Sequence, residues 1–222
     1  LLGLLALGYV MLQWWRHRHR ERRSLEFVLL EVKLPRDNEI KIDAAEQMFA
    51  SLYSVKQTGW LSFLRSEDHF TFEVVARKED IRFYVSCHKD LQDLVEKQIH
   101  VAYPGAEVKE VDEYNIFSEE GKVAFAELKI KNAAYLPIKV YRDLPTDSLS
   151  SITSALAKMG EGEGAVVQIL VVPAGSSWQT AGRAYISRVK TQEADPEKAK
   201  YRVEQKTLEQ IDNKVGKPGF HV

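Results

Sequence analysis

"HFTFEVVARKEDIRFYVSCHKDLQDLVEKQIHVAYPGAEVKEVDEY", residues 69–114, is the stretch of sequence that decides the fold. Apolar side chains of strand-forming type fill residues 69–77 and 80–88, and the short charged turn between them predicts a pair of adjacent strands. Residues 89–105 have helical spacing and end in a Pro-Gly pair, which stops a helix. Residues 106–114 then predict another strand. The stretch therefore encodes two strands, a helix and a third strand.

The chain before this stretch supplies one more strand and one more helix. Residues 24–35 alternate apolar and polar side chains, which predicts a strand. Residues 43–57 have apolar side chains at helical spacing, with Asp43 as the predicted N-cap. The resulting order, strand, helix, strand, strand, helix, strand, is the split βαβ pattern of ferredoxin-like domains. We therefore expect an α+β domain over residues 24–117, with an antiparallel sheet and both helices on one face.

Residues 118–222 predict a second α+β domain. Strands are predicted at 123–130, 135–141 and 165–172, and helices at 147–159, 178–191 and 196–215. The strand at 165–172 is a continuous apolar run, which indicates a central, covered position. A strand after Gly219 would complete a second ferredoxin-like unit, so we expect the last strand of this domain to be cut.

Residues 1–23 form the remaining part of the chain and predict a truncated transmembrane helix with a basic juxtamembrane segment. The apolar run ends near Trp15 and is shorter than the roughly 20 residues that a bilayer core requires. Since the chain does not begin with Met, we expect the start of the helix to be missing. Aromatic and then basic residues follow, as at a cytoplasmic membrane boundary. The predicted membrane-interface residues are Trp14, Trp15, Arg16, Arg18, Arg20, Arg22 and Arg23.

Other interpretations of this N-terminal segment are a signal-like segment and a soluble helix. A signal peptide has the reverse order, with basic residues first and a small-residue cleavage site last. A soluble core helix does not normally end in a cluster of arginines. Nucleic-acid binding by the Arg/His run is the second interpretation of the basic residues, behind contact with anionic lipid headgroups.

Net charge and cysteine content indicate which kinds of protein residues 24–222 can belong to. The formal net charge is −1, and residues 1–23 hold five Arg and one Glu, which leaves −5 for the rest. A mildly acidic domain argues against a dedicated nucleic-acid-binding surface. The single cysteine, Cys87, excludes an internal disulfide and fits a reducing compartment. The acidic stretch Glu107–Glu120 is interpreted as a solvated face.

Catalytic signatures are weak throughout the chain. Gly121-Lys122 and Gly216-Lys217 lack the remaining residues of a phosphate-binding P-loop. The GEGEG run, residues 160–164, precedes a predicted strand and carries two Glu that would repel phosphate, so it is interpreted as a loop between a helix and a strand. Cys87 and His88 are adjacent, so in a strand they face opposite ways and do not form a nucleophile–base pair. Cys87 is instead predicted to be a small buried side chain.

Two longer segments resemble a known family. "LLEVKLPRDNEIKIDAAEQMFASLYSV" (29–55) and "FEVVARKEDIRFYVSCHKDLQDLVEKQIHVAYPGAEVKEVDEYNIF" (72–117) resemble the amino-terminal region of membrane-anchored P-loop ATPases. These bacterial proteins belong to the HerA/FtsK-like superfamily, in the type IV secretion and conjugative DNA-transfer group. The resemblance covers nearly the whole chain and is most specific at residues 44–49 and 98–104.

The resemblance implies a membrane segment, then a domain of this pattern, and then a motor domain. ATP and Mg²⁺ are expected only in that motor, and no cofactor, metal or catalytic residue is assigned to this chain because it holds no Walker motif. The expected location is the inner (cytoplasmic) membrane, with one or a few spans and the soluble part in the cytoplasm. Implied partners are the membrane, further copies of the chain in a hexamer, and other secretion-system components; contact with DNA stays open.

The sequence thus favours a membrane-proximal, non-catalytic domain that anchors and assembles a motor transferring DNA or protein. The full-length protein would then be a P-loop ATPase. The alternative is a free-standing, membrane-anchored protein-binding module. An enzyme built on a ferredoxin-like scaffold is a third hypothesis, and the sequence gives it no convergent acid, base and nucleophile.

Overall fold

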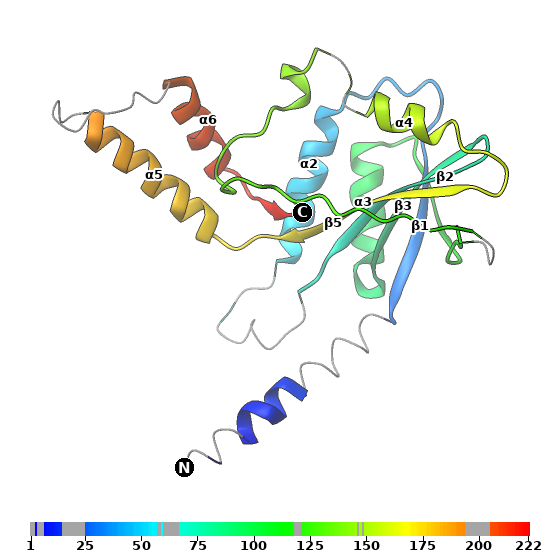
Figure 1. Ribbon diagram of the computed structural model, residues 1–222, viewed down its shortest axis with the longest axis horizontal. Helices are drawn as coiled ribbons and strands as arrows, with labels where there is room; N and C mark the ends of the chain where they lie inside the picture. Colours follow the sequence, from blue (N-terminus) through cyan, green and yellow to red (C-terminus); the bar gives the residue numbers. More distant parts are fainter. Residues whose placement is uncertain are drawn as a thin grey trace. The chain divides into compact units, whose positions relative to one another are not determined.

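The computed structural model describes residues 3, 7–14, 25–56, 59, 67–117, 121–145, 147, 149–193 and 205–222 (Figure 1). The chain divides into two compact units, which are described separately below. The first comprises Leu1–Gly121, Ala155–Pro173 and Phe220–Val222, and the second comprises Lys122–Ser154 and Ala174–Gly219.

The first unit is built on one antiparallel sheet with the strand order β4-β1-β3-β2-β5-β6. Its strands are β1 (Phe27–Lys33), β2 (Phe70–Arg77), β3 (Asp80–His88), β4 (Glu107–Val111), β5 (Gly164–Pro173) and β6 (Phe220–His221). Its helices are α2 (Asp43–Leu52) and α3 (Gln92–Ala102), with the 3-10 turns Tyr53–Val55 and Lys89–Leu91. The predicted order of strands and helices over residues 25–114 is therefore confirmed, and the fold is α+β.

Helices α2 and α3 pack on the same face of the sheet (Figure 1). The core beneath them contains Met48 and Leu52 from α2, and Val95 and Ile99 from α3. Strand residues complete this core, namely Leu30, Phe70, Val85 and Cys87, with Phe72 partly buried beside them. The helical spacing of the sequence predicts this arrangement, because apolar residues three or four apart share one face of a helix.

Local signals place the ends of these elements. Lys78 and Glu79 form the two-residue turn between β2 and β3, and Glu79, the second of the two, takes a φ of 59° in the left-handed region. Helix α2 begins at Asp43, but Ile42 occupies the N-cap position and has no side-chain capping hydrogen bond. The N-cap therefore lies one residue before Asp43, the predicted position. Helix α3 ends at Ala102, just before Pro104-Gly105.

The second unit contains the antiparallel-packed pair α5 (Ser177–Glu193) and α6 (Gln205–Val215), and the 3-10 turn Tyr141–Asp143. Its core consists of Ile186, Val189, Leu208, Ile211 and Val215, with Tyr135, Leu136, Trp178 and Tyr185 packed against it. The side-chain amide of Gln179 donates to the backbone oxygens of Val215 and Lys217 and so satisfies carbonyls at the end of α6. Helix α4 (Ser150–Leu156) is shorter than the predicted 147–159.

Three sequence predictions for residues 118–222 differ from the structure. Residues 123–130 and 135–141 are not strands. Strand β5 is not the central strand of a second sheet, because it pairs with β2, from Phe70↔Val171 to Arg77↔Gly164. The described strands therefore form one sheet where the sequence predicts two. Alternating apolar residues indicate that a segment suits a strand, but they do not identify its pairing partner.

Candidate functional site

The face of the sheet opposite α2 and α3 carries a row of polar side chains that crosses five strands. In register, Lys109 of β4 lies opposite Glu31 of β1, and Glu31 lies opposite Tyr84 of β3. Tyr84 in turn lies opposite Glu73 of β2, which lies opposite Gln168 of β5. Because residues two apart on a strand share a face, the ends of β1, β3 and β4 bring further charges beside this row. We call Lys109, Glu31, Tyr84, Glu73 and Gln168 the polar row.

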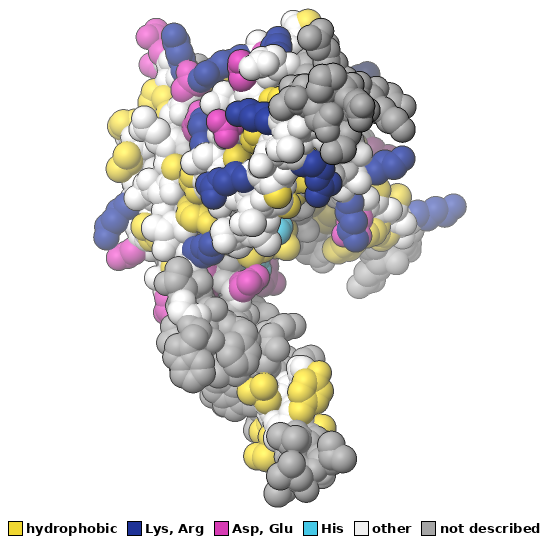
Figure 2. Space-filling view, turned by 90° about the vertical axis from the view of Figure 1, so that its left-hand side faces the viewer, with side chains coloured by type: hydrophobic (Ala, Val, Ile, Leu, Met, Phe, Trp, Pro, Cys, Tyr) yellow, Lys and Arg dark blue, Asp and Glu magenta, His cyan; other side chains and the backbone are white. Residues whose placement is uncertain are grey.

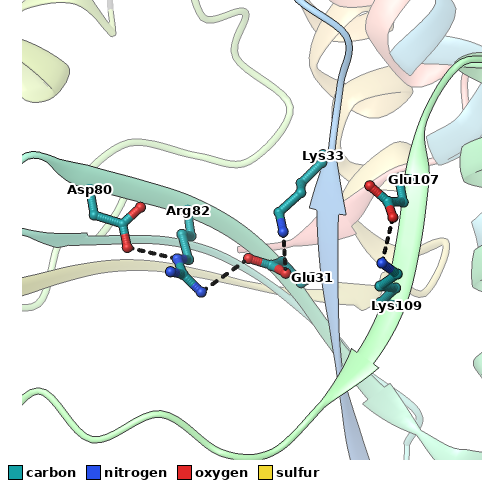
Figure 3. Close-up of polar contacts among 6 residues, drawn as sticks. All are labelled: Glu31, Lys33, Asp80, Arg82, Glu107 and Lys109. Atoms are coloured by element: carbon teal, nitrogen blue, oxygen red, sulfur yellow. Dashed lines mark hydrogen bonds and ion pairs between the residues drawn. The ribbon is translucent and has the colours of Figure 1, made fainter.

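Glu31 is the buried charge at the centre of the charged half of the row (Figure 3). Glu31 is only 6% exposed to solvent. Its carboxylate accepts from Lys33 Nζ at 2.9 Å and from Arg82 Nη1 at 3.4 Å. Arg82 also donates through Nε to Asp80 Oδ2 at 2.7 Å, and this contact raises the pKa of the guanidinium. A buried carboxylate needs such partners, since an unpaired buried charge is strongly destabilising.

Strand β4 carries a second ion pair on the same face. Lys109 Nζ lies 2.6 Å from Glu107 Oε1, and both side chains are largely exposed (Figure 3). The contact lowers the pKa of Glu107 and raises that of Lys109, chiefly through their mutual hydrogen bond. The neighbouring β1 charges act in the same direction, Lys33 on Glu107 and Glu31 on Lys109. Opposite charges therefore face each other across the β1–β4 ladder.

The other half of the row is covered by residues 112–117, which we call the strap. The Tyr114 ring stacks on Tyr84 with centroids 5.2 Å apart, and its hydroxyl donates to Glu73 Oε2 at 2.6 Å. Gln168 Nε2 donates to Glu73 Oε1 at 2.9 Å. Burial, followed by the contact with Glu73, raises the pKa of the Tyr114 hydroxyl. Glu73 is thus a second buried carboxylate, and two neutral donors stabilise it: Tyr114 of the strap and Gln168 of β5.

The strap continues toward β5. The Asn115 backbone oxygen accepts from Arg77 Nη2 at 2.6 Å. Ile116 packs with the small cluster of Leu29, Val75 and Tyr84, together with Val166 of β5. A Cβ added to Gly164 would lie 3.0 Å from the Ile116 Cβ, so a larger residue there would displace the strap. The chain therefore leaves β4 across the sheet and away from its edge.

Most of the described part of the acidic stretch Glu107–Glu120 is exposed, as the solvated-face interpretation expects. Its first part is the edge strand β4 with its ion pair, and its middle part packs the half-buried Tyr114 against the sheet. Strand β4 is the terminal strand of the sheet order, so its outer backbone edge has no strand partner within the described part of the chain. Such an edge can bind an extended peptide through backbone hydrogen bonds, with side-chain charges setting the choice of partner.

Of the predicted membrane-interface residues, only Trp14 lies among the residues that the structure describes. Trp14 lies exposed on the helical segment 7–14, whose apolar side chains are visible in Figure 2. Trp15, Arg16, Arg18, Arg20, Arg22 and Arg23 lie outside the described residues. Within the residues that the structure describes, no helix has the length and apolar character needed to cross a membrane.

The weak catalytic candidates take ordinary structural positions. Residues 160–163 of the GEGEG run form a loop between α4 and β5, as predicted, and Gly164 begins β5. The Gly160 N–H donates to Glu163 Oε2 at 2.8 Å. Cys87 is buried in the core beneath the helices, and burial raises its pKa to about 12. His88 lies 3.2 Å from Glu26 through Nε2, and its Nδ1 accepts from the Asp90 N–H. The described residues include no group of three or more His, Cys, Asp or Glu placed to hold a metal ion.

The charged residues of this site are not among the sequence predictions, although the sequence contains a signal for them. An acidic, an apolar and a basic residue follow one another in Glu31-Val32-Lys33, Asp80-Ile81-Arg82 and Glu107-Val108-Lys109. In a strand this spacing places both charges on one face and the apolar residue on the other. The triplet Glu127-Leu128-Lys129 has the same form. We call these segments the charged triplets.

Comparison with protein families matches residues 17–222 to the family described as "Domain of unknown function (DUF8128)". The matched region includes every strand of the sheet and residues of both units. No curated protein and no solved structure matches the chain.

Proposed function

This chain belongs to the DUF8128 family, and we propose that it is the membrane-proximal assembly domain of a type IV secretion or conjugation-type ATPase. In this role it anchors the motor at the inner membrane and joins neighbouring subunits. The catalytic residues, ATP and Mg²⁺ belong to a motor domain outside this chain. The soluble units lie in the cytoplasm.

The observation that carries the assembly role is the outer edge of β4. It combines a backbone edge open to pairing with the exposed Glu107–Lys109 pair. Natural proteins usually blunt exposed edges, and charged side chains restrict which strands can approach. We assign this edge to docking of another protein subunit, because a charge-patterned edge selects an extended segment of complementary charge.

The membrane role rests on the sequence of residues 1–23. An apolar run meets Trp14 and Trp15, and a cluster of arginines follows at once. Aromatic residues favour the headgroup region and arginines favour the cytoplasmic side, so this order supports an anchor leading into a cytoplasmic domain.

The finer fold assignment belongs to the same proposal. We assign residues 24–117 to a ferredoxin-like unit, which the order β4-β1-β3-β2 and the two helices on one face support. Strand β5 then extends that unit by pairing with β2. Such a unit gives the assembly a rigid sheet immediately after the membrane segment.

The membrane role is tested by deleting residues 1–23. The 222-residue chain is expected in the membrane fraction after an alkaline carbonate wash, and the chain without residues 1–23 in the soluble fraction. Far-ultraviolet circular dichroism should lose only the signal of the deleted helical residues 7–14, because the segment precedes β1. Replacement of the five arginines by glutamine serves as the matched control, since it keeps the apolar run and should leave most of the protein membrane-bound. Retention of the truncated chain in the membrane would contradict the anchor.

The motor assignment is tested by the coding sequence downstream of Val222. A Gly-x-x-x-x-Gly-Lys-Ser/Thr segment following a predicted strand supports a motor domain. A stop codon at that point would contradict it and favour the free-standing binding module.

A further inference from the structure

Residues 121–130 form an apolar segment without regular secondary structure. Four of its large side chains are strongly exposed: Val123 at 69%, Phe125 at 90%, Leu128 at 94% and Ile130 at 59%. Within the described residues, no backbone–backbone hydrogen bond reaches this segment. Its composition is typical of a strand, and within the described residues its backbone N–H and C=O groups have no backbone partner.

The charges of this segment favour an extended conformation. Lys129 Nζ lies 3.1 Å from Glu127 Oε1. Residues two apart share a face only in an extended chain, where Leu128 then points to the opposite face. The segment therefore presents its charged triplet in the same form as the edge strand β4.

The structure already contains a pairing of two charged triplets. Strands β1 and β4 run antiparallel with Lys33 opposite Glu107, Val32 opposite Val108 and Glu31 opposite Lys109. Each charge on one strand therefore faces its opposite on the other, and the two valines meet on the face covered by the helices. Strand β1 occupies only one edge of β4, and the other edge can accept the same pattern.

We propose that residues 125–129 of a second copy of this chain add antiparallel to the outer edge of β4. Lys129 then lies opposite Glu107, Leu128 opposite Val108 and Glu127 opposite Lys109. In the same register Phe125 meets Val111, which belongs to the apolar cluster of Leu29 and Tyr84. This pairing deepens the proposed function, because it names the occupant of the docking edge and rests on that role for β4.

The path of the strap favours a second copy over the same chain. After β4 the strap crosses the sheet, with Tyr114 at Glu73 and Ile116 beside Gly164. Within the strap, the chain thus runs from the β4 edge across the sheet. Residues 125–129 and the outer edge of β4 are different surfaces. Each copy can therefore insert its segment into one neighbour and accept the segment of another. Such head-to-tail contacts generate a ring when the rotation closes and a filament when it does not.

Disulfide crosslinking of the 222-residue chain in detergent tests the pairing. One copy carries Lys109→Cys, and a second copy with a larger tag carries Glu127→Cys. Both positions are exposed, so neither change disturbs a core. Cys87 stays in place because it is buried, and the unsubstituted chain measures its background. Directly opposite positions bring the Cα atoms within disulfide range, so mild oxidation should give a mixed dimer.

The register control combines Lys109→Cys in one copy with Lys129→Cys in the other. Residue 129 lies two residues from position 127, the expected partner of position 109. We expect on the order of tenfold less crosslinked dimer, because a diagonal neighbour lies beyond the preferred Cα separation. Equal crosslinking in both registers, or none in either, would overturn the pairing. When one chain carries both Lys109→Cys and Glu127→Cys, we expect a ladder of dimers and larger species. An intrachain crosslink that persists on dilution would instead assign the segment to its own β4.

Charge reversal provides a second readout. Glu127→Lys combined with Lys129→Glu preserves composition and the local ion pair, but places like charges opposite Lys109 and Glu107. Self-association measured by sedimentation should weaken about tenfold, since like charges directly opposite are destabilising. The matched control reverses Asp93 and Lys97, an exposed ion pair on α3, and should leave association unchanged.

The two proposals can fail separately. An in-register crosslink in a chain that does not reach the membrane would reject the membrane role and retain this pairing. A membrane-bound chain whose two registers crosslink equally would reject this pairing and retain the membrane role.

Discussion

Glu31 and Glu73 lie buried on the same face of the sheet, but different groups stabilise them. Glu31 is 6% exposed and is paired with two cations, Lys33 and Arg82. Glu73 is 7% exposed and accepts from Tyr114 and Gln168, which are neutral. Hydrogen bonds to a charged acceptor are stronger than those between neutral groups, so the Tyr114 hydroxyl is well placed to hold the strap on the sheet.

Tyr114→Phe is expected to destabilise the protein by about 1.5–3 kcal/mol, because it removes a donor from a buried carboxylate while keeping the ring. Urea unfolding at pH 7 measures the difference. Tyr103→Phe is the control: this ring packs beside the helical core, and its loss of a hydroxyl should cost less. Equal effects of the two substitutions would contradict the assigned role of Tyr114.

The same hydroxyl also predicts a pH dependence. Its pKa is raised in the folded state above the value of about 10 for an unfolded chain. The stabilisation is therefore fully present below about pH 10 and decreases as the pH rises above it. The unfolding free energy of the unsubstituted chain should fall more steeply between about pH 10 and 11 than that of Tyr114→Phe. If the unfolding free energies of the two proteins fell equally with pH, a group other than Tyr114 would cause the pH dependence.

At the scale of elements, helices α5 and α6 meet closely at a glycine. A Cβ added to Gly182 would lie 2.5 Å from Val215 Cγ1 and 2.9 Å from Tyr135 Cβ. Both neighbours belong to the core of the second unit, where Val215 is 1% exposed. Sequence alone suggests that a glycine in a helix is a local weakness. The packing shows that its missing side chain permits the contact.

In Gly182→Ala, overpacking is expected to lower the free energy of unfolding by about 1–3 kcal/mol. The higher helix propensity of alanine offsets about 1 kcal/mol of this loss. Thermal or urea unfolding measures the net change. Ala181→Gly is the matched control, since it changes propensity alone at an exposed position of the same helix. If Gly182→Ala stabilised as much as Ala181→Gly destabilised, the close contact would have no energetic consequence.

At the scale of the whole molecule, the sequence contains no complete P-loop, so the purified 222-residue chain should not hydrolyse ATP above the buffer blank. Phosphate release at saturating ATP and Mg²⁺ measures this. Lys122→Ala and Lys217→Ala serve as controls, because these residues follow the two glycines that most resemble a P-loop. Turnover that either substitution abolished would contradict the prediction and place a nucleotide site within this chain.

Much of the first unit could be predicted from the sequence, and the site could be predicted only in part. Met48 and Leu52 share a helix face with the expected spacing, and the predicted elements from 25 to 114 are confirmed. The charged triplets also show which charges share a strand face. The sequence does not show that Tyr114, 41 residues from Glu73, would bond to it across the sheet. That contact depends on the direction in which the chain leaves β4.

The sequence by itself determined the local properties of this protein: which segments suit helices or strands, which residues share a face, and the apolar, aromatic and basic order of residues 1–23. These properties depend on side-chain spacing within a few residues. Tertiary structure alone decided that β5 joins β2, that the strap covers Glu73, and that 123–130 lacks a strand partner within the described chain. The physical reason is that strand pairing is a competition among distant segments with similar local patterns. Only the assembled sheet determines which edge each segment occupies.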